Sequence, residues 1–130
     1  MTEMASVLIV EDDTPIRDIL RISLTDEGYE VMAAANGEQA LRFLQDFKPG
    51  LIVLDMMMPI MDGAAFRELQ RQLGLATDAR LIVLSASRTA RPQAAALGAQ
   101  FIIEKPFELD ELLDAVQQAL AVGSAASPAR

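Results

Sequence analysis

The chain has 130 residues with no cysteine and no histidine, and its formal net charge is −8. This length suits one domain with a core of useful size. Without cysteine there is no disulfide or thiolate metal site, and without histidine the commonest acid–base residue and transition-metal ligand is missing. A metal site should therefore hold a hard, oxygen-liking cation such as Mg²⁺.

The acidic balance and the N-terminal sequence also limit the partners. A sequence pI of about 4.4 argues against nucleic acid or an anionic membrane as a direct partner, because both attract basic surfaces. The N-terminus lacks a basic segment followed by an apolar stretch, and no apolar run approaches the ~20 residues of a membrane span. We therefore expect no signal peptide, no membrane span and a cytoplasmic location.

Five short apolar runs alternate with five helical patterns. We expect strands at residues 7–10, 30–34, 51–55, 81–85 and 101–103. The third run is four apolar residues leading directly into Asp55, as in a strand that is buried on both faces of a parallel sheet. Alternating strands and helices predict an α/β fold. We expect a doubly wound, five-stranded parallel sheet of order 2-1-3-4-5, a flavodoxin-like (βα)5 arrangement.

Helix signals follow each run. The expected helix starts are Asp13 or Thr14 with Pro15, Asn36 or Gly37, Asp62 with Gly63, Pro92, and the segment before Leu109. Gly28 and Gly98 are expected to end the first and fourth helices. Apolar residues at helical spacing give the last helix, around residues 109–120, a clear apolar face, and they place Phe66, Leu69 and Leu73 on one face of the third helix. We assign residues 1–122 to one domain and residues 123–130, which are small and polar, to a disordered tail or a linker remnant.

The informative polar residues all follow strands. They are Glu11, Asp12, Asp55, Ser85 and Lys105. Taken singly, the acids could be helix caps, the serine a loop residue and the lysine a solvated charge. In a sheet of the expected order they converge, because the first and third strands are neighbours at one edge. Mg²⁺ would compensate the clustered carboxylates.

This group suits phosphoryl transfer to a carboxylate. Aspartate can act as a nucleophile and form an acyl phosphate. The transferred group carries negative charge on its equatorial oxygens, so that catalysis is mainly positioning and charge neutralisation. Mg²⁺ and Lys105 would neutralise the charge, and Ser85 would donate a hydrogen bond to a phosphoryl oxygen.

The sequence resembles the receiver domain of two-component response regulators, in particular single-domain chemotaxis regulators, over roughly residues 5–121. The matching segments are residues 10–13, 54–63, 84–86 and 104–107. The resemblance implies that Glu11, Asp12 and Asp55 bind the metal and that Met57 offers its backbone carbonyl to Mg²⁺. It implies that Asp55 also accepts the phosphoryl group. It also implies that Ser85 and Lys105 contact the phosphoryl group, and that the bond from Lys105 to Pro106 is cis.

The resemblance further implies the partners. A histidine kinase or histidine phosphotransfer protein would donate the phosphoryl group, and a downstream effector or a missing output domain would read the altered conformation. The last helix, the fourth helix and the fifth strand are the implied surface for that partner. The sequence leaves homodimer formation open. Such a chain is not a conventional enzyme, although it would catalyse its own Mg²⁺-dependent phosphorylation and dephosphorylation.

Two positions depart from the family pattern. Ile102 stands where receivers usually carry an aromatic switch residue, and Phe101 should point to the opposite face of the sheet. We therefore expect signalling through movement of the fourth helix and its preceding loop; an unmoved helix in a structure with a phosphoryl mimic would contradict this. Met57 and Ser87 occupy the positions that tune hydrolysis in the family. A methionine offers water only a weak acceptor, so we expect slow self-dephosphorylation.

Other interpretations stay open. The chain could be a receiver module cut from a larger regulator, or a degenerate receiver that acts only as a protein-binding module. A haloacid dehalogenase phosphatase would need a second aspartate two residues after Asp55, where this chain has Met57. A flavodoxin-type electron carrier would need a hydroxyl- and glycine-rich phosphate loop after the first strand, and the sequence has none there.

Overall fold

A computed structural model describes residues 5–58, 61–86 and 91–129, with side chains as far as residue 121. Its strands are β1 (Ser6–Val10), β2 (Glu30–Ala34), β3 (Leu51–Asp55), β4 (Arg80–Ser85) and β5 (Phe101–Glu104). All neighbouring strands pair in parallel, in the order β2-β1-β3-β4-β5. The expected sheet and its order are confirmed.

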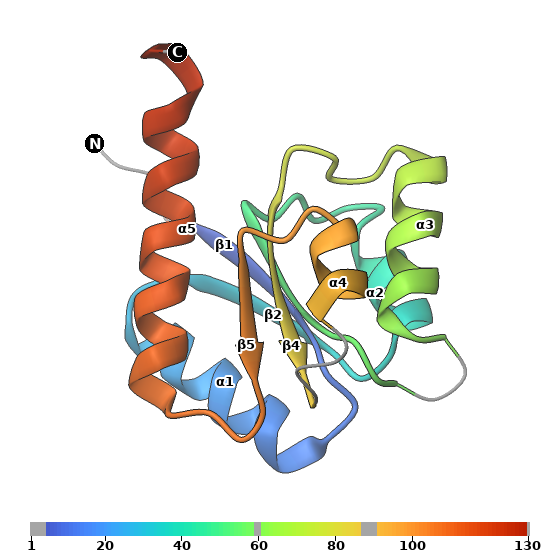
Figure 1. Ribbon diagram of the computed structural model, residues 1–130, viewed down its shortest axis with the longest axis horizontal. Coiled ribbons are helices and arrows are strands. Elements are labelled where there is room, and N and C mark those ends of the chain that lie inside the picture. Colours follow the sequence, from blue (N-terminus) through green and yellow to red (C-terminus); the bar gives the residue numbers. More distant parts are fainter. Residues whose placement is uncertain (1–4, 59–60, 87–90, 130) are drawn as a thin grey trace.

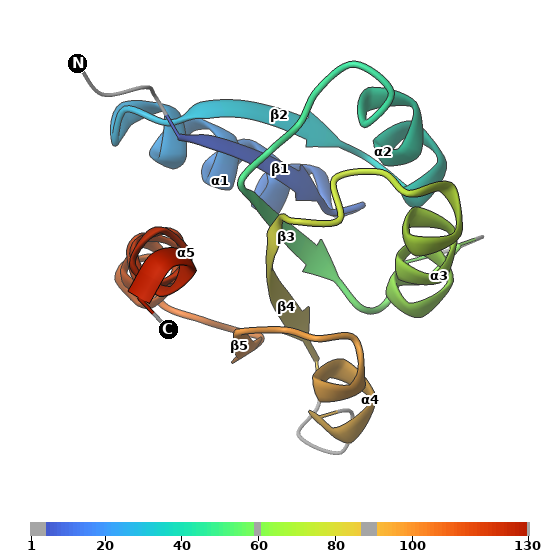
Figure 2. The same ribbon diagram turned by 90° about the horizontal axis from the view of Figure 1, so that it is seen from above.

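Helices cover both faces of this sheet (Figures 1 and 2). They are α1 (Thr14–Asp26), α2 (Gly37–Phe43), α3 (Gly63–Leu73), α4 (Arg91–Ala96) and α5 (Leu109–Ala129). One core lies between the sheet and α1 and α5, and includes Val53 and Leu112. The other lies between the sheet and α2, α3 and α4, and includes Leu54 and Phe66. Because successive side chains of a strand point to opposite faces, the unbroken apolar run of β3 supplies both cores.

Capping residues begin three helices where the sequence predicts them. The side chains of Asp13, Asn36 and Asp62 accept hydrogen bonds from backbone N–H groups in the first turns of α1, α2 and α3. Gly28, which follows α1, has a φ of +98°, and Gly98, which follows α4, has a φ of +86°; both values favour glycine. The caps thus fix where the loops at the sheet's carboxyl edge end, and the two glycines mark where loops at the opposite edge begin.

One expectation about a helix differs from the structure. The apolar face expected on α3 is buried at Phe66, but Leu73 is 57% exposed. Arg67 and Gln70 are buried instead, because each has hydrogen-bond partners inside the protein. Helix α5 runs to Ala129 and takes in most of the segment 123–130. The division at residue 122 therefore does not coincide with a helix end, and the assignment of 123–130 to a tail or linker stays a prediction.

Candidate functional site at the carboxyl edge of the sheet

Asp55 is the last residue of β3 and is held from several sides. Its backbone pairs with Leu84 of β4, and its side chain is buried, with 2% of the residue exposed. The backbone N–H of Met57 donates to Asp55 Oδ1 at 3.2 Å. Gly63, the first residue of α3, packs so closely beneath this strand end that a Cβ there would lie 3.0 Å from the carbonyl oxygen of Asp55. The missing side chain at Gly63 therefore lets α3 support the strand that carries the carboxylate.

Glu11 and Asp12 follow β1, the neighbour of β3 in the sheet. Glu11 is fully buried, whereas Asp12 is exposed. Oxygen atoms of these two carboxylates and of Asp55 all lie within 4.8 Å of one another. The structure thus brings together the three acids that the sequence predicts to converge.

Lys105 follows β5 and extends its ammonium group toward two of these acids. Its Nζ lies 3.0 Å from Glu11 Oε1 and 3.4 Å from Asp55 Oδ2. Its backbone N–H donates to the carbonyl oxygen of Ser85 at 2.7 Å, which ties the end of β5 to the end of β4. The peptide bond from Lys105 to Pro106 is cis, as the family resemblance implies. Ser85 itself is buried at the end of β4, directly beside the strand that bears Asp55.

The electrostatics of the group follow from burial. Burial, and then the charge of Glu11, raise the pKa of Asp55 to about 7, although Lys105 and the Met57 N–H act in the opposite direction. Burial alone would lower the pKa of Lys105, but its close contact with Glu11 and the negative charges of Asp55 and Glu11 outweigh that effect and raise it. Three carboxylates around one ammonium leave an excess of negative charge at the sheet edge.

The residues present fit a hard divalent cation. Glu11 Oε2 accepts from the Asp13 N–H at 3.1 Å, but the buried Oε1 atom has no well-aligned hydrogen-bond donor among the described residues, even though Lys105 lies near it. A buried oxygen in that state is suited to a metal ion. The three acids offer carboxylate oxygens, and the chain has no histidine or cysteine, so the donor set is the one that Mg²⁺ prefers. The use of the Met57 carbonyl as a further ligand stays a prediction, and Ser87 lies outside the described residues.

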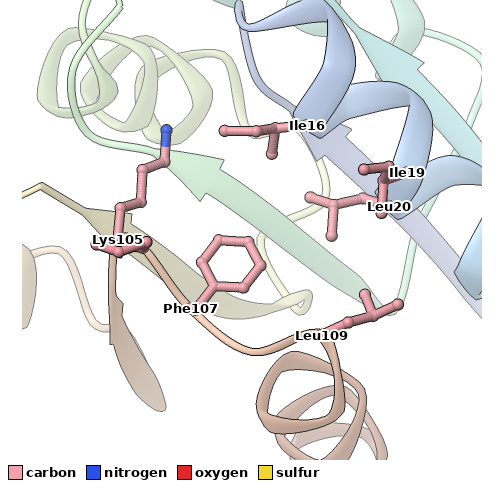
Figure 3. Close-up of a pocket in the computed structure, with 7 residues that line it drawn as sticks. Ile16, Ile19, Leu20, Lys105, Phe107 and Leu109 are labelled. Atoms are coloured by element: carbon pink, nitrogen blue, oxygen red, sulfur yellow. The ribbon is translucent and has the colours of Figure 1, made fainter.

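An apolar groove, which was not predicted from the sequence, lies beside Lys105 (Figure 3). The groove has a volume of about 450 Å³ and is lined by Ile16, Ile19, Leu20, Lys105, Pro106, Phe107 and Leu109. Ile19 and Ile22, on the outer side of α1, are 53% and 51% exposed. The sequence did contain a signal for an exposed apolar surface. With Leu20 and Leu24 on the inward face of α1, that face cannot also bury all three isoleucines at positions 16, 19 and 22.

Comparisons with known proteins agree with this geometry. The family described as "Response regulator receiver domain" matches residues 7–117. Response regulator MprA of Mycobacterium tuberculosis is 41% identical over 110 residues, which are 82% of this chain and 46% of that relative. The chain therefore spans about half the length of the curated relatives it matches.

Solved structures of the same family superpose closely. Chemotaxis protein CheY4 of Vibrio cholerae has a TM-score of 0.82 at 33% identity, covering 90% of this chain and 99% of that one. Response regulator TrrA of Thermotoga maritima, solved in complex with Mg(2+)-BeF, has a TM-score of 0.77 at 33% identity, covering 89% of this chain and 99% of that one. The family match, the sequence identity and the structural superposition all cover the part of the chain that carries Glu11, Asp12 and Asp55. The chain belongs to the response regulator receiver domain family of two-component signalling.

Proposed function

We propose that Asp55 accepts a phosphoryl group in a Mg²⁺-dependent reaction and that the chain then changes conformation to control a partner. The observation that carries the proposal is the contact of one ammonium group, that of Lys105, with both Glu11 and Asp55 at a buried sheet edge. A carboxylate nucleophile needs neighbouring positive charge when a phosphoryl group arrives.

Each residue of the site has a role in this reaction. Asp55 attacks the phosphorus atom and becomes an acyl phosphate, while the bond from phosphorus to the donor breaks. Glu11 and Asp12, with the Met57 carbonyl, would hold Mg²⁺, which when bound neutralises charge on the phosphoryl oxygens. Lys105 would turn from Glu11 toward one of those oxygens, and Ser85 would donate its hydroxyl to another.

The phosphoryl donor is proposed to be a protein that carries a phosphohistidine. This chain has no histidine of its own. A donor must bring its phosphoryl group to Asp55, and the apolar groove shares Lys105 with the site, so that it offers a docking surface at the required place. An Ile19→Ser variant should then accept the group more slowly from a phosphohistidine protein but at an unchanged rate from acetyl phosphate. Equal slowing with both donors would refute the docking role.

Partners beyond the donor are proposals of the same kind. A downstream effector or an output domain would read the conformational change, because the relatives matched by this chain are about twice as long. Among the described residues, no helix combines the length and apolar character needed to cross a membrane. A cytoplasmic location stays part of the proposal.

Binding of beryllofluoride tests the site without requiring turnover. This anion occupies the place of a phosphoryl group on a carboxylate. We expect bound ¹⁹F resonances when Mg²⁺ and beryllofluoride are added to the chain, and none with EDTA or with Asp55→Asn. Bound resonances that persist in Asp55→Asn would place the anion elsewhere and contradict the proposal.

A further inference from the structure

We propose that Arg17 is a positioning residue for the turn between β1 and α1 (residues 11–13), holding it so that the carboxylates of Glu11 and Asp12 face Asp55. The inference rests on the proposed function. It adds a residue that touches neither Mg²⁺ nor the phosphoryl group and that acts only through the backbone of the two acids.

The side chain of Arg17 folds back along α1 onto this turn. Its Nη1 atom donates to the carbonyl oxygen of Glu11 at 2.9 Å and to that of Asp12 at 3.3 Å. Its Nη2 atom donates to Thr14 Oγ1 at 3.4 Å. A planar guanidinium with fixed donor directions that contacts two successive carbonyl groups restricts the orientation of both peptide planes. Those planes set the directions in which the side chains of Glu11 and Asp12 leave the backbone.

The charge of Arg17 is not explained by α1 itself. A cation in the first turns of a helix opposes the helix dipole. Within the described part of the chain, Arg17 forms no ion pair with a carboxylate, whereas Arg21 on the same helix pairs with Asp18 at 3.8 Å. The hydrogen bonds of Arg17 go instead to the backbone of the turn and to one hydroxyl. Its hydrogen bonds to the turn therefore account for a positive charge at this end of the helix.

Other contacts also hold Glu11, whereas the carbonyl group of Asp12 is held by Arg17. The Glu11 N–H donates to the Ala34 carbonyl at 3.1 Å, and the Asp13 N–H donates to Glu11 Oε2 at 3.1 Å. Apart from Arg17, no described side chain is recorded as a donor to the carbonyl of Asp12. Mg²⁺ requires near-ideal octahedral geometry, so a loosened turn should weaken binding even when every carboxylate is present.

Two effects of Arg17 on Mg²⁺ have opposite signs, and variants separate them. Its positive charge repels the cation, whereas its hydrogen bonds prepare the ligands. Arg17→Lys keeps the charge and loses the planar fork, and Arg17→Met loses both. If positioning dominates, both variants bind Mg²⁺ about tenfold more weakly, the usual scale for residues that orient metal ligands. If charge repulsion dominates, Arg17→Met binds more tightly and Arg17→Lys is unchanged.

Calorimetric titration of the full chain with Mg²⁺ at fixed ionic strength measures this difference. The matched control is Arg21→Met, because Arg21 is on the same helix and its ion pair with Asp18 joins side chains that are 48% and 51% exposed. We expect the Kd for Mg²⁺ to rise in both Arg17 variants and to stay unchanged in the control. Melting in EDTA checks folding; if Arg17→Met does not melt cooperatively, Arg17→Lys decides.

Phosphorylation by acetyl phosphate gives a second readout that a merely structural role would not produce. We expect the Arg17 variants to need more Mg²⁺ for half-maximal rate and to regain the wild-type rate at saturating Mg²⁺. An unchanged Mg²⁺ requirement in Arg17→Lys, beside a wild-type chain that binds Mg²⁺ and is phosphorylated, overturns the inference alone. A wild-type chain that binds no Mg²⁺ overturns the proposed function and this inference together.

Discussion

At the scale of single residues, Asp55 and Glu11 are two buried carboxylates that meet beside one ammonium group. Lys105 contacts both, but burial and the charge of Glu11 still raise the pKa of Asp55 to about 7. The sequence predicts which residues meet, because each directly follows a strand. It does not predict that Glu11 is fully buried and that Asp12 is exposed, since both residues lie in the same turn and only the tertiary packing distinguishes them.

The raised pKa of Asp55 predicts a pH-dependent stability in the absence of metal. The folded state binds a proton on Asp55 more tightly than the unfolded state does, so this contribution is fully present below the ordinary pKa of 3.8 and is lost as the pH rises through about 7. In EDTA, Asp55→Asn should exceed wild type in free energy of unfolding by on the order of 1–3 kcal/mol at about pH 8, and by little at about pH 4.

Urea unfolding at the two pH values in EDTA measures this prediction. Asp78→Asn, a change at an exposed carboxylate away from the site, is the control and should show no such trend. Saturating Mg²⁺ should reduce the advantage of Asp55→Asn, because the cation replaces the missing positive charge. An Asp55→Asn variant no more stable than wild type at the higher pH would contradict the account.

Met57 is the residue for which we predict a kinetic effect. The residue is 68% exposed, and its backbone N–H donates to Asp55 Oδ1, so it lies beside the carboxylate that we propose to be phosphorylated. A thioether orients water poorly. We predict slow loss of the phosphoryl group and a several-fold shorter half-life in Met57→Asn, measured from the decay of phosphorylated chain after the donor is removed. An unchanged or longer half-life would refute the prediction.

At the scale of elements, helix caps and strand ends could be predicted, but the inner face of α3 could not. Asp13 and Asn36 cap the helices that the sequence predicts, because capping depends on residues close in sequence. Arg67 and Gln70 are buried because backbone carbonyl groups accept their hydrogen bonds. The carbonyl that accepts from Arg67 belongs to Leu97, thirty residues later in the chain, and the one that accepts from Gln70 belongs to Leu75, in the loop after α3. An apolar-spacing argument therefore expected Leu73 to be on the inner face of the helix, and this was wrong.

Arg67 connects α3 to the end of α4, and its removal should destabilise the fold. Its Nε atom donates to the Leu97 carbonyl at 2.9 Å, and its Nη1 atom donates to Gln70 Oε1 at 2.8 Å. In Arg67→Met the Leu97 carbonyl keeps a hydrogen bond from Arg71, but the buried side-chain oxygen of Gln70 loses the donor that Arg67 provides. We predict a loss of about 1–3 kcal/mol in free energy of unfolding, the usual cost of a buried polar group without its partner.

Urea unfolding measures that loss, and Gln72→Ala is the control on the same helix. Gln72 is exposed and bonds only to Glu68 among the described hydrogen bonds, so its removal should change stability by less than ~0.5 kcal/mol. A similarly small effect of Arg67→Met would show that the link between α3 and α4 adds nothing to stability.

The switch also belongs to the scale of elements. Ile102 packs into the core beneath α2, α3 and α4, while Phe101 packs into the core of α1 and α5. The opposite orientations expected from strand alternation are therefore confirmed. The loop at residues 87–90 lies outside the described residues, so movement of α4 in signalling stays a prediction.

At the scale of the whole molecule, the order of the strands brings the residues of the site together. Parallel strands in the order β2-β1-β3-β4-β5 place the ends of β1 and β3 side by side, and with them all the acids of the site. Alternating strand and helix patterns predict parallel strands, because such strands need crossover connections, whereas the order of the strands is what the family resemblance implies. The apolar groove could not be predicted in the same way, because it forms between α1 and the segment before α5, which are far apart in sequence.

Intact mass after incubation with acetyl phosphate and Mg²⁺ tests the central claim most directly. The account predicts a gain of one phosphoryl group, lost in Asp55→Asn and lost when EDTA removes Mg²⁺. No gain, under conditions that phosphorylate a known receiver, would contradict the claim that Asp55 accepts a phosphoryl group. A gain that persists in Asp55→Asn would contradict it equally, because the group would then be on another residue.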